Sequence, residues 1–293
     1  MLNKPIKPML LQPSGEVMAE TGWLHSLKWD GIRILLHYDN GKTRAFTRHG
    51  NEVTQSFFPE LDRIKLPIQN AIFDGEAICL NPQTSPPSPC WEDVMSRSQT
   101  KKEQAVRQAS VSKPVHFIIW DMLFYNNRSI LIRDFLERRQ LLERAIVNTD
   151  EISVTTLYED GQSLFMRAKE LGLEGICSYN VKPGGNSHYY LDSRPGNVWV
   201  KTKAYQYAKC QITSIRKSKF GWGLSVDGRY VGMLEFPPSS SIVKEVYRRT
   251  NQIIREENNE WIILDPGVSA RIKFQCYTKA GKLRSPKLEE LCS

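Results

Sequence analysis

Long apolar runs and paired cysteines are both missing from this 293-residue sequence. No run approaches the roughly 18 apolar residues that a membrane-spanning helix needs. The opening residues, MLNKPIKPML, carry prolines where a signal peptide needs an unbroken apolar stretch. We therefore expect a cytoplasmic protein that makes no contact with a membrane. The six cysteines form no C-x-x-C pair, which leaves a zinc site without support and favours reduced, buried thiols.

Basic residues are in excess and are unevenly distributed. The chain has 40 Lys and Arg against 32 Asp and Glu, a net charge of +8. Residues 204–293 hold 15 of the basic and 9 of the acidic residues, so most of the surplus lies in the last third of the chain. Such a surplus favours a polyanionic partner, although many basic proteins bind none. The length allows one large domain or two smaller ones.

Residues 1–203 predict a mixture of strands and a few helices. Apolar and β-branched segments predict strands at 31–38, 42–47, 70–80, 115–125, 175–179 and 198–200. Helical patterns occupy 91–109, 134–146 and 163–171. After Lys203 the pattern changes to short strands at 210–215, 223–226, 230–236, 261–264 and 270–277, with a helix at 242–256. Several short strands with one helix among them fit a small barrel of the oligonucleotide-binding type.

The segment Lys28-Trp29-Asp30-Gly31-Ile32-Arg33 combines a lysine, a carboxylate and an arginine. A lysine attacks phosphorus only as the neutral amine, a form that costs about 4.6 kcal/mol at pH 7 for an ordinary pKa of about 10.4. Burial or nearby positive charge must lower this cost. Carboxylates close to the lysine act in the opposite direction unless a metal ion neutralises them, so lysine chemistry here predicts a divalent metal. The alternative is a solvated lysine before a turn.

This K-x-D-G-x-R segment resembles the nucleotidyl-acceptor motif of the superfamily of ATP-dependent DNA ligases, RNA ligases and mRNA capping enzymes. The other motifs of that superfamily follow in order: Arg48-His49-Gly50, Asp74-Gly75-Glu76, Trp120-Asp121, Glu174-Gly175 and Trp199-Val200-Lys201-Thr202-Lys203. Alone, each has an ordinary explanation, such as a turn at Asp74-Gly75, an exposed edge strand at 201–203 or a core position for Trp120. Six motifs in order across residues 28–203 favour the functional interpretation.

The resemblance implies a role for each matched residue. Lys28 is the nucleophile on the α-phosphate of ATP, with Arg33, Lys201 and Lys203 as the other catalytic residues. Glu76 and Glu174 are the metal ligands, for Mg²⁺ or for Mn²⁺ in its place. The implied nucleotide contacts are Ser26, Leu27, Arg33, Arg48, Glu76, Trp120, Glu174, Lys201 and Lys203.

Two positions depart from the superfamily pattern. The E-G motif usually ends in a basic residue, and here that position is Tyr179. The residue two before the lysine is often acidic in DNA ligases, and here it is Ser26. A hydroxyl or the backbone of Leu27 must then read the adenine edge, which leaves the preference for ATP less secure.

The end of the chain carries a second resemblance. Residues 281–286, Gly-Lys-Leu-Arg-Ser-Pro, are similar to the G-x-L-R-x-P ending of DNA-ligase barrel domains. Phe220 and Trp222, within a glycine loop, are candidates to pack on sugars or bases, with core or turn packing as the alternative. Together with Arg48 and Arg284 they are the predicted DNA contacts.

We therefore expect an α+β protein. Residues 1–203 form an adenylation domain, of the nucleotidyltransferase and ATP-grasp-like type, with antiparallel sheets and flanking helices, and residues 204–293 form an OB-fold β-barrel. The expected activity is that of a monomeric ATP-dependent DNA ligase that seals nicked duplex DNA, in repair, replication or recombination. The alternatives are an RNA ligase, a GTP-using capping-type nucleotidyltransferase and a non-catalytic nucleic-acid-binding protein.

Overall fold

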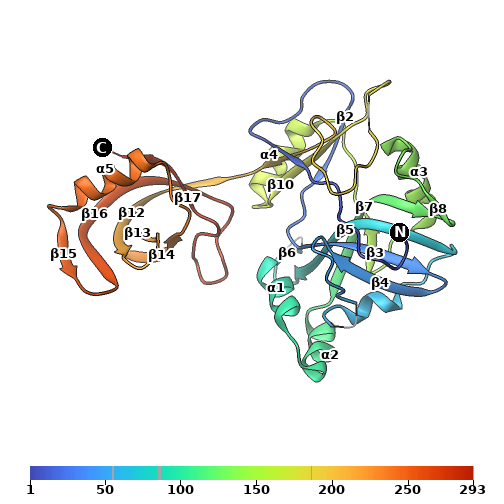
Figure 1. Cartoon of the computed structure of the whole chain (residues 1–293), viewed down its shortest axis with the longest axis horizontal. Helices are drawn as coiled ribbons and strands as arrows, with labels where there is room; N and C mark the ends of the chain where they lie inside the picture. Colours follow the sequence, from blue (N-terminus) through green and yellow to red (C-terminus); the bar gives the residue numbers. More distant parts are fainter. Residues whose placement is uncertain (55, 85–86, 186, 293) are drawn as a thin grey trace. The chain divides into compact units, whose positions relative to one another are not determined.

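The computed structural model describes residues 1–54, 56–84, 87–185 and 187–292 of the chain. It divides into two compact units, Met1–Lys203 and Ala204–Ser293 (Figure 1). All six cysteines are free thiols. Among the described residues, no helix is both long enough and apolar enough to cross a membrane.

The larger sheet of the first unit has seven strands in the order β4-β3-β5-β7-β8, with β6 paired to β5 and β9 paired to β7. All pairings are antiparallel except that of β7 with β9. The strands are β3 (Ile32–Asp39), β4 (Lys42–Thr47), β5 (Asn70–Asn81), β6 (Ser88–Pro89), β7 (Val115–Tyr125), β8 (Arg128–Ser129) and β9 (Ile152–Val154). The apolar alternation of β3, β5 and β7 buries one continuous core against this sheet.

The second sheet of this unit has four strands in the order β1-β11-β10-β2. They are β1 (Gln12–Ser14), β2 (Trp23–Leu27), β10 (Gly175–Asn180) and β11 (Trp199–Lys203), and only the β1–β11 pairing is parallel. Because β11 lies between β1 and β10, Lys201 and Lys203 are not on an edge strand.

Helices accompany both sheets of the first unit. They are α1 (Trp91–Gln99), α2 (Glu103–Ser112), α3 (Phe135–Ala145) and α4 (Gly161–Glu170), together with a 3-10 helix, Pro59–Arg63. A capping box of Asp134 and Glu137 starts α3. Packing joins α3 to β7, and α4 to β10 and β2.

An aromatic cluster joins the two sheets of the first unit. Phe135 of α3 stacks on Tyr179 of β10, with ring centroids 4.7 Å apart, and Trp199 of β11 meets both rings edge-on. The same cluster includes Leu35 of β3. This packing fixes the four-stranded sheet, whose strand β2 leads directly into Lys28, against the sheet that carries Glu76.

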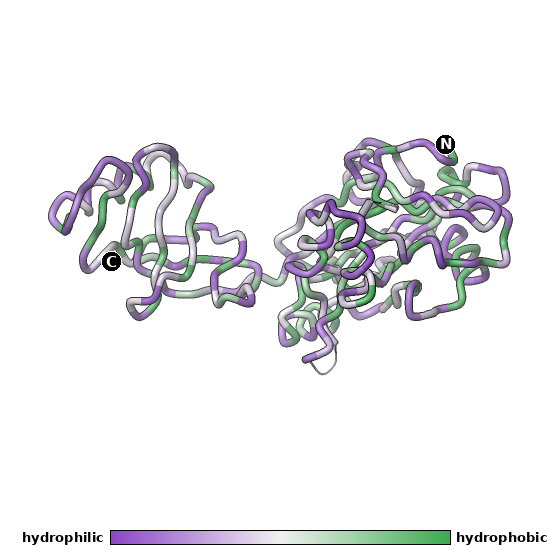
Figure 2. The backbone as a smooth tube through the Cα atoms, turned by 90° about the horizontal axis from the view of Figure 1, so that it is seen from below, coloured by the Kyte–Doolittle hydropathy of each residue, from purple (hydrophilic) through white to green (hydrophobic). Residues whose placement is uncertain are grey.

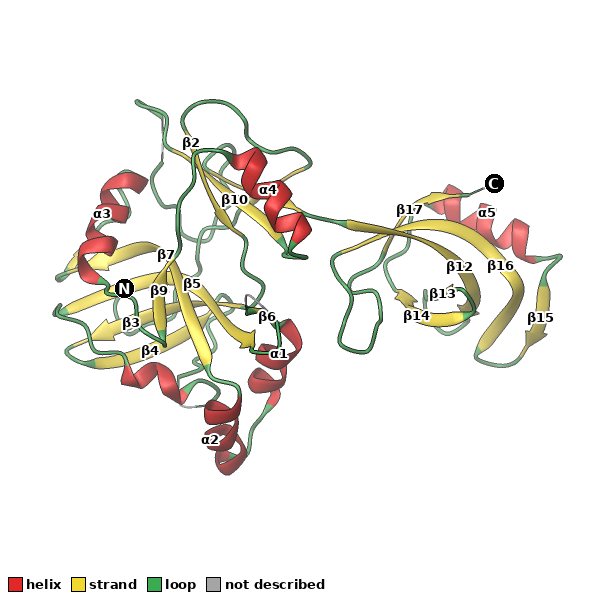
Figure 3. Cartoon of the chain, turned by 180° about the vertical axis from the view of Figure 1, so that it is seen from behind, coloured by secondary structure: helices red, strands yellow, loops and turns green. Residues whose placement is uncertain are grey.

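The second unit is a strongly curved sheet accompanied by a helix (Figure 3). Its order is β14-β13-β12-β16-β15, with β17 also paired to β16. The strands are β12 (Gln206–Arg216), β13 (Trp222–Val226), β14 (Arg229–Leu234), β15 (Ile254–Glu257), β16 (Trp261–Phe274) and β17 (Lys287–Leu291), and the helix is α5 (Ser240–Thr250). Apolar residues of these strands and of α5 form a separate core, and the connecting loops are mainly hydrophilic (Figure 2).

The antiparallel sheets with accompanying helices confirm the predicted mixed fold, but several boundaries were wrong. The expected helix at 91–109 is two helices. The expected helix at 242–256 ends at Thr250, and 254–257 pair with β16 instead, a non-local contact that a local pattern does not reveal. The expected strands at 261–264 and 270–277 are a single strand, β16. Asp74-Gly75 lies inside β5 and makes no turn.

Candidate active site

Three strand ends of the four-stranded sheet bring charged side chains together. Lys28 directly follows β2, and its backbone N–H donates to the carbonyl of Gly175 at 2.9 Å. Gly175 is also opposite Lys203 in the β10–β11 register, so Glu174 lies next to both lysines. The pairing of β2, β10 and β11 therefore assembles motifs that are far apart in the sequence.

Glu174 bridges two of these lysines. Its Oε2 accepts from Lys28 Nζ at 2.5 Å, and its Oε1 lies 2.7 Å from Lys203 Nζ. The side chains of Lys28 and Glu174 are 19% and 7% exposed. One nearly buried carboxylate thus holds the proposed nucleophile and a second amine at the same place.

The charges around Lys28 favour its protonated form. Burial acts against the ammonium, but Glu174, Cys177 and Glu76 outweigh it and raise the pKa of Lys28 above its usual range. Burial likewise acts on Glu174, yet Lys28 and Lys203 lower the pKa of its carboxyl. Lys28 therefore rests as an ammonium in an ion pair, and the neutral amine requires a change in its surroundings.

Lys201 adds a further positive charge to this cluster. Burial and the nearby charges of Lys28, Lys203 and Arg194 lower the pKa of Lys201. Crowded cations of this kind repel one another unless an anion lies among them, which fits a phosphate group.

Glu76 comes from the other sheet and faces the loop after Lys28. Its Oε1 accepts from the backbone N–H of Gly31 at 3.2 Å. Burial, with the neighbouring Glu174, outweighs Lys28 and raises the pKa of Glu76 to about 8. The strands around Glu76 are closely spaced, because a Cβ on Gly31 or on Gly75 would lie within 2.3 Å of a backbone oxygen of the neighbouring strand.

Arg33 is fixed by partners that include a residue the sequence did not reveal. Its Nε and Nη2 donate to the two oxygens of Asp74 at 2.9 and 2.6 Å, and its guanidinium lies 5.3 Å from the Trp120 ring centroid. The Tyr189 hydroxyl donates to Asp74 at 2.7 Å. Asp74 belongs to the D-G-E motif, so the sequence marks it as a site residue. Tyr189 is 115 residues from Asp74 along the chain, and no local sequence pattern marks it.

The two departures from the superfamily pattern are in contact. Ser26 Oγ lies 3.0 Å from the Tyr179 hydroxyl, and Ser26 is 1% exposed. The Ser26 hydroxyl therefore already has a buried partner, whereas Leu27 is half-buried against α4. Cys177, which is opposite both Ser26 and Lys201, has its pKa raised to about 11 by burial.

Arg48 follows the last strand of the hairpin formed by β3 and β4. It is exposed on the turn after β4, where its Nε lies 3.0 Å from Nε2 of His49. In the described part of the chain, no contact joins Arg48 to Lys28 or Glu174.

The second unit corrects the predicted DNA contacts. Trp222 is 0% exposed, because it pairs with core residues Ile215 and Leu234 and points into the core. Trp222 therefore takes the alternative, core packing, and the predicted contact of its ring with DNA was wrong. Phe220 packs on it with ring centroids 5.0 Å apart, and the backbone of Arg284 bonds to Cys276 and Gln275.

The carboxylates present fit a magnesium ion better than a metal held by protein alone. Among the described residues, no group of three or more His, Cys, Asp or Glu is arranged to hold a metal. Mg²⁺ keeps several waters and commonly binds one or two carboxylates together with substrate phosphates. The elevated pKa of Glu76 beside Glu174 marks a place where a cation would stabilise two ionised carboxyls.

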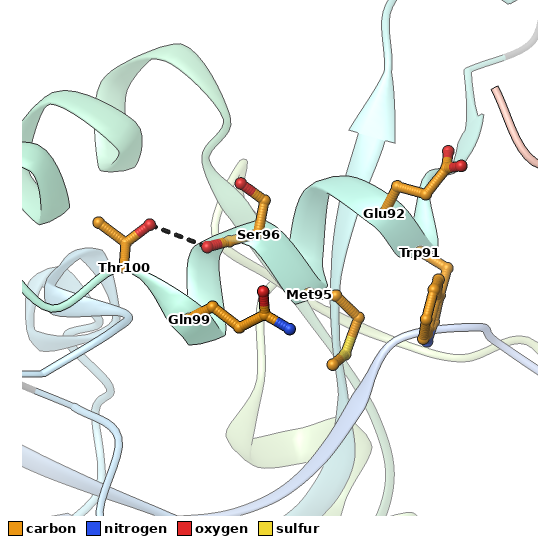
Figure 4. Close-up of a pocket in the computed structure, with 6 residues that line it drawn as sticks. All are labelled: Trp91, Glu92, Met95, Ser96, Gln99 and Thr100. Carbon is orange, nitrogen blue, oxygen red and sulfur yellow. Dashed lines mark hydrogen bonds between the residues drawn. The ribbon is translucent and has the colours of Figure 1, made fainter. Parts of the chain in front are cut away.

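Two shallow pockets lie away from this cluster. One follows α1 and is lined by Trp91, Glu92, Met95, Ser96, Gln99 and Thr100 (Figure 4). The other lies beside residues 20–22 and 182–183. Neither includes a residue of the predicted site.

Sequence comparison identifies similar proteins over nearly the whole chain. Residues 8–203 match the family model described as ATP dependent DNA ligase domain. The SPbeta prophage-derived DNA ligase-like protein LigB of Bacillus subtilis is 31% identical over 286 residues, covering 97% of this chain and 98% of that protein. A DNA ligase of Methanopyrus kandleri is 25% identical over 320 residues, covering 97% of this chain but 56% of that protein.

Solved structures share the fold. A chain from a structure–function analysis of Lig E DNA ligases aligns with a TM-score of 0.65 at 16% identity, covering 98% of this chain and 99% of that one. The ligase domain of LigD from M. tuberculosis aligns with a TM-score of 0.56 at 21% identity, covering 98% and 95%. At these identities the likeness concerns the fold alone.

Proposed function

The chain belongs to the family of ATP-dependent DNA ligases, and we propose that it seals 5′-phosphate/3′-hydroxyl nicks in duplex DNA through AMP bound covalently to Lys28. The observation that carries this proposal is the assembly of Lys28, Glu174 and Lys203 at adjoining strand ends, with Lys201 two residues before Lys203 on β11. Phosphoryl transfer depends chiefly on positioning and on charge stabilisation, and this cluster can supply both.

The first step joins Lys28 to the nucleotide. The neutral amine attacks the α-phosphorus of ATP, a P–N bond forms, the bond to the β-phosphate oxygen breaks, and pyrophosphate leaves. Lys201 and Lys203 stabilise the charge that develops on the α-phosphate oxygens. Arg33, held by Asp74, and Trp120 beside it line the nucleoside side of the site. Arg48 and Leu27 complete the proposed nucleotide contacts. Ser26 is proposed to line the nucleotide site without a hydrogen bond from its hydroxyl to the adenine, since that hydroxyl bonds to Tyr179.

Glu76 and Glu174 are the residues that would hold Mg²⁺. When bound, Mg²⁺ supplies positive charge that favours ionised carboxyls and stabilises phosphate oxygens. Glu174 is the main partner that raises the pKa of Lys28, so any loss of its negative charge would make release of the Lys28 proton less costly.

The second and third steps act on DNA. A 5′-phosphate oxygen attacks the phosphorus of the lysyl-AMP, which frees Lys28 and leaves AMP joined to the DNA end. The 3′-hydroxyl then attacks the 5′-phosphorus, the phosphodiester bond forms, and AMP leaves. We propose Arg48 as a contact for the terminal phosphate of the nick, which its exposed position after β4 supports.

Residues 204–293 are proposed to form an OB-fold barrel that contributes to DNA binding. The curved sheet with one helix supports this, and so does the surplus of 15 basic over 9 acidic residues. We also propose that the protein acts in the cytoplasm as a monomer.

Covalent labelling tests the central step. Incubation with labelled ATP and Mg²⁺ should attach AMP to the wild-type chain, and mass spectrometry should locate it on Lys28. Lys28→Ala should remove the label, while Lys65→Ala, an exposed lysine of the same unit, should retain it. Label on a folded Lys28→Ala protein would contradict the assignment.

The remaining alternatives concern substrate and nucleotide. Labelled GTP should give little covalent product if the site prefers ATP, and a strong GTP label would favour a capping-type enzyme. Matched nicks in DNA and RNA duplexes should be sealed with preference for DNA. A clear preference for the RNA nick would favour an RNA ligase.

A further inference from the structure

A chain of hydrogen bonds connects the backbone near the start of the protein to Arg33. The backbone N–H of Met9 donates to the Tyr189 hydroxyl at 3.1 Å, and this hydroxyl donates to Oδ2 of Asp74 at 2.7 Å. Asp74 in turn accepts from Arg33 through both of its oxygens, at 2.9 and 2.6 Å. Met9 and Arg33 can only donate to the hydroxyl oxygen, so the single hydroxyl proton is directed to Asp74.

Tyr189 is itself held on several sides. It is 3% exposed, and its backbone N–H donates to the carbonyl of Leu131 at 2.9 Å. Its ring meets that of Trp199 edge-on, with centroids 5.3 Å apart. The N-terminal segment is fastened beside it, since the N–H of Leu10 donates to the carbonyl of Ser193 at 2.8 Å. The hydroxyl is therefore a donor in a fixed position.

Asp74 depends on this donor for its orientation. In the described part of the chain, its carboxyl oxygens bond only to Arg33 and Tyr189. Arg33 uses Nε and Nη2 for the contact, and its Nη1 bonds to no described residue. A guanidinium is planar, so the plane of the Asp74 carboxyl determines where Nη1 points. Tyr189 is the partner that fixes this plane independently of Arg33.

We propose that Tyr189 is a positioning residue for self-adenylation, whose hydroxyl sets the plane of Asp74 and thereby aims Nη1 of Arg33 at the bound nucleotide. The inference rests on the proposed ligase function and adds to it a residue outside all of the matched motifs. Tyr189 is too deeply buried to contact ATP and acts only through its two partners. Displacement of a substrate-holding group by about 1 Å can lower a rate by about 10²-fold, so a small rotation of Arg33 has a measurable effect.

Single-turnover labelling separates positioning from folding. The rate constant is measured at saturating ATP and Mg²⁺, and the final fraction of labelled chain measures how much protein is folded and active. Tyr189→Phe keeps the ring but removes the hydroxyl. It should lower the rate constant about tenfold and leave the final labelled fraction unchanged. A wild-type rate constant in this variant overturns the proposal.

Tyr38→Phe is the matched control. Tyr38 is also 3% exposed, and its hydroxyl bonds to both the carbonyl and the N–H of Leu66, at 3.1 and 3.0 Å. This variant loses a buried hydroxyl in the same unit, so it should be destabilised to a similar degree while it keeps the wild-type rate constant. An equal loss of rate in Tyr38→Phe would show that the effect of Tyr189→Phe is a general one and would overturn the proposal.

A double variant tests whether Tyr189 acts through Arg33. Lysine cannot make the side-on contact of a guanidinium with one carboxylate, so Arg33→Lys should already remove what Tyr189 sets. Tyr189→Phe should therefore cause little further loss of rate in the Arg33→Lys background. The same tenfold loss in both backgrounds would show that the two residues act independently, and would overturn the proposal.

Solvent exchange of the Arg33 Nε–H, followed by NMR and assigned by its absence in Arg33→Lys, measures the placement without ATP. Exchange should be faster in Tyr189→Phe than in the wild type and unchanged in Tyr38→Phe. Equal exchange in Tyr189→Phe and the wild type overturns the proposal. Absence of label from the wild-type chain would instead contradict the proposed function, while the exchange measurement would still show whether Tyr189 holds Arg33.

Discussion

The Nζ atom of Lys28 lies 2.5 Å from Oε2 of Glu174 in a largely buried ion pair. In this state the lysine is protonated and cannot attack phosphorus. The carboxylate therefore holds the proposed nucleophile in position but favours its unreactive ammonium form. A divalent metal held by Glu174 and Glu76 would weaken this effect, because it would neutralise part of the carboxylate charge.

Loss of Glu174 or of Lys201 should impair labelling far more than DNA binding. Glu174→Gln removes the negative charge that is proposed to bind the metal. Lys201→Met removes a positive charge that is proposed to stabilise the α-phosphate. Groups that stabilise developing charge typically contribute about 10²–10³ in rate. We expect losses of that order in the rate of self-adenylation, with affinity for nicked DNA within about twofold of wild type. Near-normal labelling of either variant would remove that residue from the catalytic set.

Self-adenylation should become faster as the pH rises from about 6 to about 9. The raised pKa of Lys28 makes the neutral amine rare at low pH, and its fraction grows with pH. The carboxyl of Glu76, whose pKa is about 8, also ionises in this range and becomes a better metal ligand. Single-turnover labelling at saturating ATP and Mg²⁺ measures this dependence. A rate independent of pH would show that proton release from Lys28 does not limit the step.

Much of this site could be predicted because its residues belong to contiguous motifs. A glycine lies close in sequence to each of Lys28, Glu76 and Glu174. At Gly31 and Gly75 the neighbouring strand leaves no room for a Cβ, so these two motif positions require glycine. Tyr189 had no such signal, since only the folded chain brings its hydroxyl to Asp74. Trp222 was misinterpreted because glycines flank it, which suggested a loop, whereas the register of β13 turns its ring into the core.

Asp121 is expected to be structural although it lies in a recognised motif. Both of its oxygens accept from Arg138, at 2.9 and 2.7 Å, and both side chains are fully buried. Asp121→Ala leaves a buried guanidinium without its partner, a change that typically costs about 3–5 kcal/mol. The exposed pair of Arg167 and Glu170 provides a control, since Arg167→Ala should cost less than about 1 kcal/mol. Denaturant unfolding measures the loss of stability in each variant. Equally small losses in Asp121→Ala and Arg167→Ala would contradict a structural role for Asp121.

His37 should make the first unit sensitive to acid. Burial, with Arg44 and the N-terminus nearby, lowers the pKa of His37 from 6.5 to about 4, and its Nδ1 accepts from the backbone N–H of Asn3 at 2.9 Å. The unfolded chain takes up this proton below about pH 6.5 and the folded chain only near pH 4. The contribution of neutral His37 to the free energy of unfolding is therefore fully present above about pH 6.5. It is lost as the pH falls toward 4, and the loss amounts to at most about 3 kcal/mol. The free energy of unfolding of the His37→Phe variant should depend less on pH between about 6.5 and 4. His49 is exposed, so the His49→Gln variant should show the pH dependence of the wild type. A wild-type dependence in His37→Phe would contradict the assignment.

The final prediction concerns the contribution of the whole second unit. Residues 204–293 carry most of the net positive charge. A fragment ending at Lys203 keeps its own core and every proposed catalytic residue. It should bind nicked DNA more weakly and with a shallower salt slope, since each neutralised phosphate contributes about 0.9 to that slope. It should also lose most self-adenylation if the second unit helps to orient the pyrophosphate leaving group. Binding across a salt series and ATP labelling, measured on the fragment and the full chain, test the two effects separately. Equal slopes would mean that the basic surplus of the second unit is a solvated surface, and that the first unit alone holds the DNA.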